Sequence, residues 1–92
     1  MNRCRGEYTS ILVESFRNRE PGHRYPIEIR PISGQVFPTH FLVECPMSMR
    51  KDFPVGTIFR ICAKIKDTPF DRPHLYTSYK WPFEVITSRT KR

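Results

Sequence analysis

Residues 56–66 read Gly56-Thr57-Ile58-Phe59-Arg60-Ile61-Cys62-Ala63-Lys64-Ile65-Lys66, and this stretch decides the fold class. From residue 59 onward, apolar side chains alternate with basic or polar ones. The apolar parity carries Phe59, Ile61, Ala63 and Ile65, and the other parity carries Arg60, Cys62, Lys64 and Lys66. Side chains of a β-strand point alternately to its two faces, so a period of two is typical of a half-buried strand. The stretch therefore predicts a strand with one buried face and one basic face.

The composition of the whole chain also favours strands over helices. It contains eight Ile, five Val and seven Thr, against one Ala and three Leu. β-Branched side chains lose rotamer freedom in a helix and pack well on a pleated sheet. Nine prolines are spread along the 92 residues, which leaves little room for a long helix.

Four further segments show apolar alternation and are predicted strands: residues 8–16, 24–32, 37–45 and 75–86. Turn residues separate them. Pro21-Gly22 is typical of a type II turn, and Ser33-Gly34 predicts a short hairpin between the second and third strands. The segment 46–55 has room for one helical turn near residues 47–52, with Ser48 as its N-cap.

Five short strands with mostly adjacent connections predict a mostly-β fold. We expect a small bent antiparallel five-stranded sheet or a half-open barrel, SH3-like or OB-like, with the short helix near residues 47–52. The alternative is an α+β roll. Residues 1–86 are expected to form a single domain, followed by a basic, mobile tail at residues 87–92. We expect ten residues to be mostly buried: Ile27, Ile29, Phe41, Val43, Phe59, Ile61, Ala63, Ile65, Trp81 and Phe83.

The cysteines and the lengths of the apolar runs indicate in which cellular compartment the protein is expected. Cys4, Cys45 and Cys62 are odd in number and widely spaced, which predicts reduced thiols rather than a disulfide framework. Cys62, on the basic face, is expected to be exposed, with its pKa lowered by its basic neighbours. No apolar run reaches the length of a membrane span, and the first residues do not resemble a secretory signal. A cytoplasmic location without membrane contact is therefore expected.

The residue types that carry catalysis do not cluster in this sequence. The one histidine with acidic residues close to it in the sequence is His74, which follows Asp67 and Asp71. The same segment also contains prolines, and Asp next to Pro is typical of an ordinary turn. The four glycines stand apart, so no phosphate-cradling loop is formed. We expect no enzymatic activity, no cofactor and no metal.

A basic surface indicates function more strongly than the candidate group around His74 does. The net charge is +7, and eleven of the sixteen basic residues are Arg. The outward faces of strands 56–66 and 75–86 are expected to lie side by side. They would present a nucleic-acid-binding set of Arg60, Lys64, Lys66, Tyr76 and Lys80. Cations within reach of phosphates, beside an aromatic ring that stacks a base, are how single-stranded nucleic acid is held. A solvated sheet face that prevents aggregation would show the same residues.

The alternative function is a protein-interaction or oligomer-forming module, of a kind that a bacterial mobile element could encode. It would use the apolar loop residues Met47, Met49, Phe53 and Phe70, because exposed methionines make adaptable contact surfaces. Its basic charge would suit an acidic protein partner. Exposed apolar loops in so small a domain also favour a homodimer.

Overall fold

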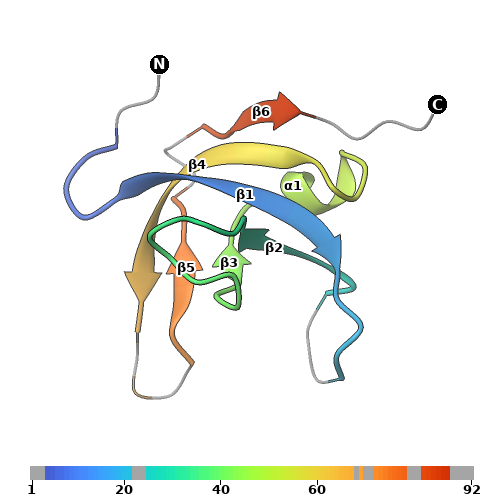
Figure 1. The fold of residues 1–92 in the computed structure, drawn as a ribbon, viewed down its shortest axis with the longest axis horizontal. Coiled ribbons are helices and arrows are strands. Elements are labelled where there is room, and N and C mark those ends of the chain that lie inside the picture. Colours follow the sequence, from blue (N-terminus) through green and yellow to red (C-terminus); the bar gives the residue numbers. More distant parts are fainter. Residues whose placement is uncertain (1–3, 22–24, 68, 70–71, 79–81, 88–92) are drawn as a thin grey trace.

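The computed structural model describes residues 4–21, 25–67, 69, 72–78 and 82–87. They form one bent, open β-sheet and a single short helix (Figure 1). The elements in chain order are β1 (Thr9–Arg17), β2 (Ile27–Pro31), β3 (Val43–Glu44), α1 (Ser48–Lys51), β4 (Ile58–Lys66), β5 (His74–Tyr76) and β6 (Glu84–Thr87). The mostly-β prediction is confirmed. No helix in the described ranges is long and apolar enough to cross a membrane.

The strands are ordered β2-β1-β4-β5-β3, and β6 pairs with β4 outside this path. All pairs are antiparallel except β3 with β5, which run parallel. The sheet therefore departs from the expected five antiparallel strands. The predicted strand 75–86 is divided, because β5 pairs with Lys64–Lys66 and β6 pairs with the opposite end of β4, at Ile58–Arg60. Figure 1 shows β4 bending between these two ends.

The core lies on the predicted parity of the strands. Phe59, Ile61, Ala63, Ile29 and Val43 are at most 1% exposed. Ile27, Phe41 and Phe83 are half-buried, and Trp81 lies outside the described residues. From other segments, the core gains Ile11, Val13, Met49 and Leu75. The ring of Phe59 meets those of Phe53 and Phe83 edge to face, with centroids 5.3 and 5.5 Å away.

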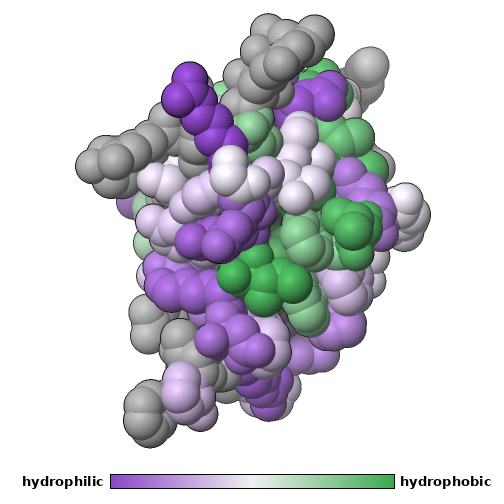
Figure 2. Space-filling model, turned by 90° about the vertical axis from the view of Figure 1, so that its left-hand side faces the viewer, coloured by the Kyte–Doolittle hydropathy of each residue, from purple (hydrophilic) through white to green (hydrophobic). Residues whose placement is uncertain are grey.

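The prediction that Ile65 is buried is wrong, because this residue is 49% exposed. The ladder between β1 and β4 ends at the pair Thr9–Ala63. Ile65 lies two residues beyond this pair, so β1 does not flank it. Figure 2 views the molecule from the side where β4 ends, and it shows apolar side chains gathered between hydrophilic ones on that face.

The short helix occurs where the sequence predicts it, but its cap differs. The N-cap is Met47, whose side chain makes no capping hydrogen bond, and Ser48 is already inside the helix. The helix turns Met49 fully into the core. Burial of this side chain explains why the turn starts one residue earlier than the capping preference of Ser48 suggests, since packing outweighs a single capping bond.

The predicted hairpin at Ser33-Gly34 does not form: β2 pairs with β1, and within the described ranges no ladder joins β2 to β3. The segment after β2 instead follows β1. The side-chain amide of Gln35 accepts a hydrogen bond from the Leu12 amide (2.8 Å) and donates one to the Leu12 carbonyl (2.6 Å). The Gln35 side chain thus pairs with the N–H and C=O groups of Leu12, which a further strand would otherwise have paired.

Arg50 of α1 fills the seam between β2 and β3. Its guanidinium donates to the carbonyls of Val43 (3.3 Å) and Cys45 (3.4 Å) and to the carboxylate of Glu28 in β2 (3.2 Å). It also stacks over the ring of Tyr25, 4.3 Å from the centroid. The side chains of Arg50 and Glu28 are 9% and 7% exposed. A charged side chain therefore takes the place of the missing ladder and leaves the barrel half-open at this seam.

Candidate binding surface

The structure brings together the predicted residues of β4 and β5. Lys64 is the ladder partner of Tyr76, and Lys66 is the partner of His74. Ladder partners point to the same side of a sheet, so these side chains share one face. Arg60 lies on the same strand parity but is flanked by Glu84 of β6. Lys80 lies outside the described residues.

Tyr8, which was not among the predicted residues, joins this face. It precedes Thr9, the ladder partner of Ala63, and thus lies beside Lys64. The Lys64 ammonium is 5.2 Å from the centre of the Tyr8 ring, and the Lys66 ammonium is 5.1 Å from the centre of the Tyr76 ring. We call Tyr8, Lys64, Tyr76 and Lys66 the tyrosine–lysine row. Its only sequence signal was the parity of Tyr8 in the first strand, and that signal needs the β1–β4 pairing to be known.

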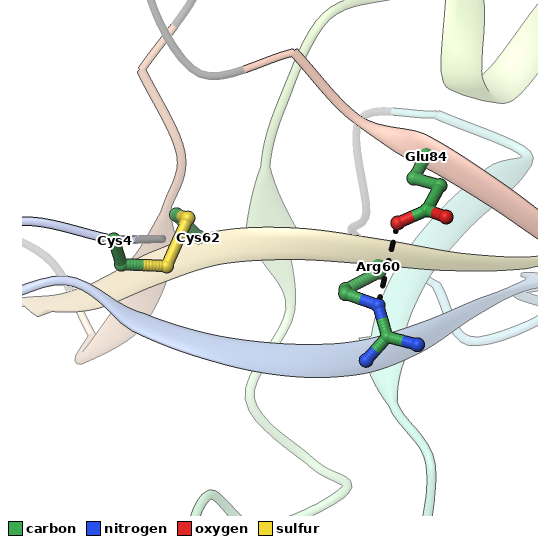
Figure 3. Close-up of a disulfide and its surroundings, with 4 residues drawn as sticks. All are labelled: Cys4, Arg60, Cys62 and Glu84. Atoms are coloured by element: carbon green, nitrogen blue, oxygen red, sulfur yellow. Dashed lines mark ion pairs between the residues drawn. A yellow bond between two sulfur atoms is a disulfide. The ribbon is translucent and has the colours of Figure 1, made fainter. Parts of the chain in front are cut away.

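A disulfide holds the chain that leads into Tyr8. Cys4 and Cys62 are bonded, with their Cα atoms 5.5 Å apart (Figure 3). The prediction of three reduced thiols is therefore wrong. So is the prediction of an exposed Cys62, which is only 3% exposed. Spacing could not reveal the bridge, because the partners are 58 residues apart and only the fold brings them together.

Each described cation of the predicted set has an acidic neighbour. Arg60 is 3.4 Å from Glu84, Lys64 is 3.8 Å from Glu7, and Lys66 is 3.4 Å from Glu44. These pairs are well exposed to solvent, and exposed ion pairs contribute little to stability. Little free energy is therefore lost when a ligand anion replaces one of these carboxylates.

A groove of about 750 Å³ adjoins the row along the seam between β2 and β3. It is lined by Tyr25 and Leu42 and by the buried Arg50–Glu28 pair. Its ionisable rim consists of Glu44, Lys66, Arg72 and His74. We call it the seam groove. Lys66 belongs to both features, so the groove begins where the tyrosine–lysine row ends.

The Glu44 carboxylate is held by two donors at the rim. It lies 3.1 Å from His74 Nε2 and 3.4 Å from the Lys66 ammonium. The hydrogen bond with His74 is the largest cause that lowers the pKa of Glu44 below its ordinary value; partial burial opposes it, and Lys66 adds to the lowering. Glu44 is thus an anion held by side chains of β4 and β5 at the rim of the groove.

Cys45, a free cysteine, also lines the groove. Burial raises the pKa of Cys45 to about 11. The thiolate is the reactive form, and a buried thiol with a raised pKa is inert near neutrality. In the described part of the chain, no three His, Cys, Asp or Glu side chains come close enough to hold a metal ion. Asp71, part of the candidate group around His74, lies outside the described residues.

The predicted partner-binding residues do not form one surface. Met47 is 42% exposed, but Met49 is fully buried and Phe53 is half-buried against Phe59. Phe70 lies outside the described residues. Of this set, Met49 is therefore wrong as a contact residue, because α1 turns it into the core. Exposed apolar side chains occur instead on β6, where Val85 is 41% and Ile86 is 38% exposed.

Comparisons with known proteins found no match. No protein-family model matches the chain, and neither does any curated protein or any solved structure.

Proposed function

We propose that the protein is a small, basic, non-enzymatic module that binds single-stranded nucleic acid. The observation that carries this proposal is the tyrosine–lysine row, in which two aromatic rings and two ammonium groups lie side by side, from the residue before β1 across β4 to β5. Proteins that bind single strands without sequence preference combine cations along the backbone with rings on which bases stack. Tyr8 supplies the second ring that such a surface needs.

The position of the seam groove supports the same function. OB-like half-open barrels bind oligonucleotides on the face of their second and third strands, between the loops that follow the first and fourth strands. Here the groove lies along the β2–β3 seam. Tyr25 reaches it from the β1–β2 connection, and Arg72 reaches it from the β4–β5 connection.

Salt titration of oligonucleotide binding tests the charge in the row. Each phosphate neutralised on a single strand contributes about 0.7 to the slope of log affinity against log salt. Lys64→Ala should reduce the slope by about that amount and weaken all sequences alike. Lys64→Arg, which keeps the charge, is the matched control and should keep the slope.

Substitution of Tyr76 separates stacking from charge. Tyr76→Ala should weaken binding by about 1–3 kcal/mol and leave the salt slope nearly unchanged. Tyr76→Phe keeps the ring and should bind like the unmodified protein. Thermal unfolding of each variant verifies that the fold is intact. If Tyr76→Ala binds as tightly as Tyr76→Phe, the basic face acts only as a solvated surface and the proposal is wrong.

A protein-interaction or oligomer-forming role is the second candidate, and β6 favours it. All four residues of this strand are exposed, and in the described ranges it pairs only with β4. An exposed strand edge with apolar side chains is a template for another chain. A homodimer or an acidic protein partner would use this edge. Light scattering at high micromolar concentration tests the homodimer, and a Val85→Lys variant should shift a dimer to monomer.

The cytoplasmic location belongs to this proposal, and the disulfide provides its test. Disulfides persist in oxidising compartments and are rare in the cytosol. Alkylation of free thiols in intact cells, followed by mass analysis, would show whether Cys4 and Cys62 react. Labelling of both cysteines supports a cytoplasmic location. An intact bridge in the cell contradicts it.

A further inference from the structure

The rim of the seam groove has one carboxylate, that of Glu44, and three side chains that can donate hydrogen bonds to an anion. Glu28 is neutralised by Arg50 at 3.2 Å, with both side chains buried. Glu44 faces both Lys66 and His74. Among the described residues, the guanidinium of Arg72 contacts no acid, although Arg72 lines the groove. The groove is therefore left with excess positive charge.

His74 adds a hydrogen-bond donor beside these charges. Its Nδ1 lies 3.1 Å from the Arg72 carbonyl oxygen, and its Nε2 lies 3.1 Å from the Glu44 carboxylate. Both neighbours are acceptors, so the ring nitrogen that carries the proton donates it to one of them. The contact with the Arg72 carbonyl also holds the His74 ring against the backbone of Arg72. His74, Lys66 and Arg72 all line the rim of the seam groove, and we call this part of the rim the cationic corner.

We propose that this corner binds a phosphate monoester, namely the terminal phosphate of a single-stranded nucleic acid. The inference rests on the proposed function and deepens it. A terminal phosphate carries about −1.5 to −2 charges at neutral pH, whereas the Glu44 carboxylate carries one. The phosphate therefore displaces Glu44 from Lys66 and His74 and adds a bond with the free fork of Arg72.

The size of the groove fits this ligand. Ligand pockets have volumes of about 300–1,000 Å³, and the seam groove, at about 750 Å³, lies in the upper part of that range. Tyr25 and Leu42 supply the apolar wall for the terminal nucleoside. Lys66 lies at the junction with the tyrosine–lysine row, so the remainder of the strand continues over Tyr76 and Lys64.

Binding of matched oligonucleotides tests the inference directly. The same labelled sequence is prepared with a 5′-phosphate, with a 3′-phosphate and without a terminal phosphate. One phosphorylated form should bind at least about tenfold more tightly than the unphosphorylated form, as expected for charge-assisted hydrogen bonds. Arg72→Ala should remove most of this difference, because it should weaken binding of the phosphorylated form much more than binding of the unphosphorylated form.

Glu44→Gln gives a second and opposite readout. Removing the competing negative charge should increase the affinity for the phosphorylated form several-fold. Glu84→Gln is the matched control, because Glu84 pairs with Arg60 of β4 and does not line the groove. It should leave the ratio between phosphorylated and unphosphorylated forms unchanged. Both glutamates have half-exposed side chains, 52% and 53%, so neither substitution removes packing.

The outcomes separate the two proposals. Equal binding of all three oligonucleotides overturns the phosphate site and leaves the nucleic-acid function standing. Binding of a nucleoside monophosphate that depends on Arg72, with no binding of any oligonucleotide, supports a phosphate monoester site and overturns the nucleic-acid function. Binding of inorganic phosphate alone, unaffected by Arg72→Ala, overturns the site.

Discussion

Loss of the disulfide should remove much of the stability of this small domain. Cys4 and Cys62 are separated by 58 residues. In the chain-entropy model, a cross-link that closes a loop of this length lowers the entropy of the unfolded chain by about 14 cal/mol/K, which corresponds to about 4 kcal/mol at 25 °C. Domains are stable by only about 5–15 kcal/mol, so a loss of this size is large. Cys4→Ala is the cleaner substitution, because Cys62 is nearly fully buried and its truncation would also cost packing.

Urea denaturation of the oxidised protein, the reduced protein and Cys4→Ala measures the effect. With a slope of about 1 kcal/mol per molar urea, the midpoint should fall by several molar on reduction, and Cys4→Ala should unfold near the reduced protein. Cys45→Ala is the control and should retain the response to reductant. Equal midpoints with and without reductant would refute the assignment of the bridge. So would three reactive thiols in the oxidised, denatured chain.

Three further predictions concern stability and reactivity. Phe59→Ala should destabilise the fold by about 3–5 kcal/mol, because it empties the centre of the core, whereas the 71% exposed Val36 should tolerate Ala within about 0.5 kcal/mol in the same urea assay. Arg50→Met should cost about 3–5 kcal/mol by leaving the Glu28 carboxylate buried and unpaired, and adding Glu28→Gln should recover part of that loss in a double-mutant cycle. Because burial raises the pKa of Cys45 from 9.0 to about 11, the folded chain keeps a proton that the unfolded chain loses. Its contribution is thus fully present below pH 9 and is lost as the pH rises towards about 11, a loss that Cys45→Ala should remove in unfolding measured against pH.

The sequence by itself determined the local features of this protein. The alternation in residues 59–66 predicted β4, its buried parity and its basic parity, and all three are present apart from the exposed end at Ile65 and the buried Cys62. The short helix was predicted from the room available between strands. These features follow from the period of the backbone and the size of the neighbouring side chains, so a short stretch of sequence contains the information.

Only the tertiary structure decided which segments meet. The partner of β1 is β4, about fifty residues away, and this pairing places Tyr8 beside Lys64 and Cys4 beside Cys62. Arg50 bridges the seam that a β2–β3 hairpin was expected to close, and the seam stays open as a groove. Periodicity shows which face of a strand is buried, but it carries no information on which distant strand lies alongside. That choice depends on loop closure and on the packing of the whole core, and the candidate binding surface is made by the same long-range contacts.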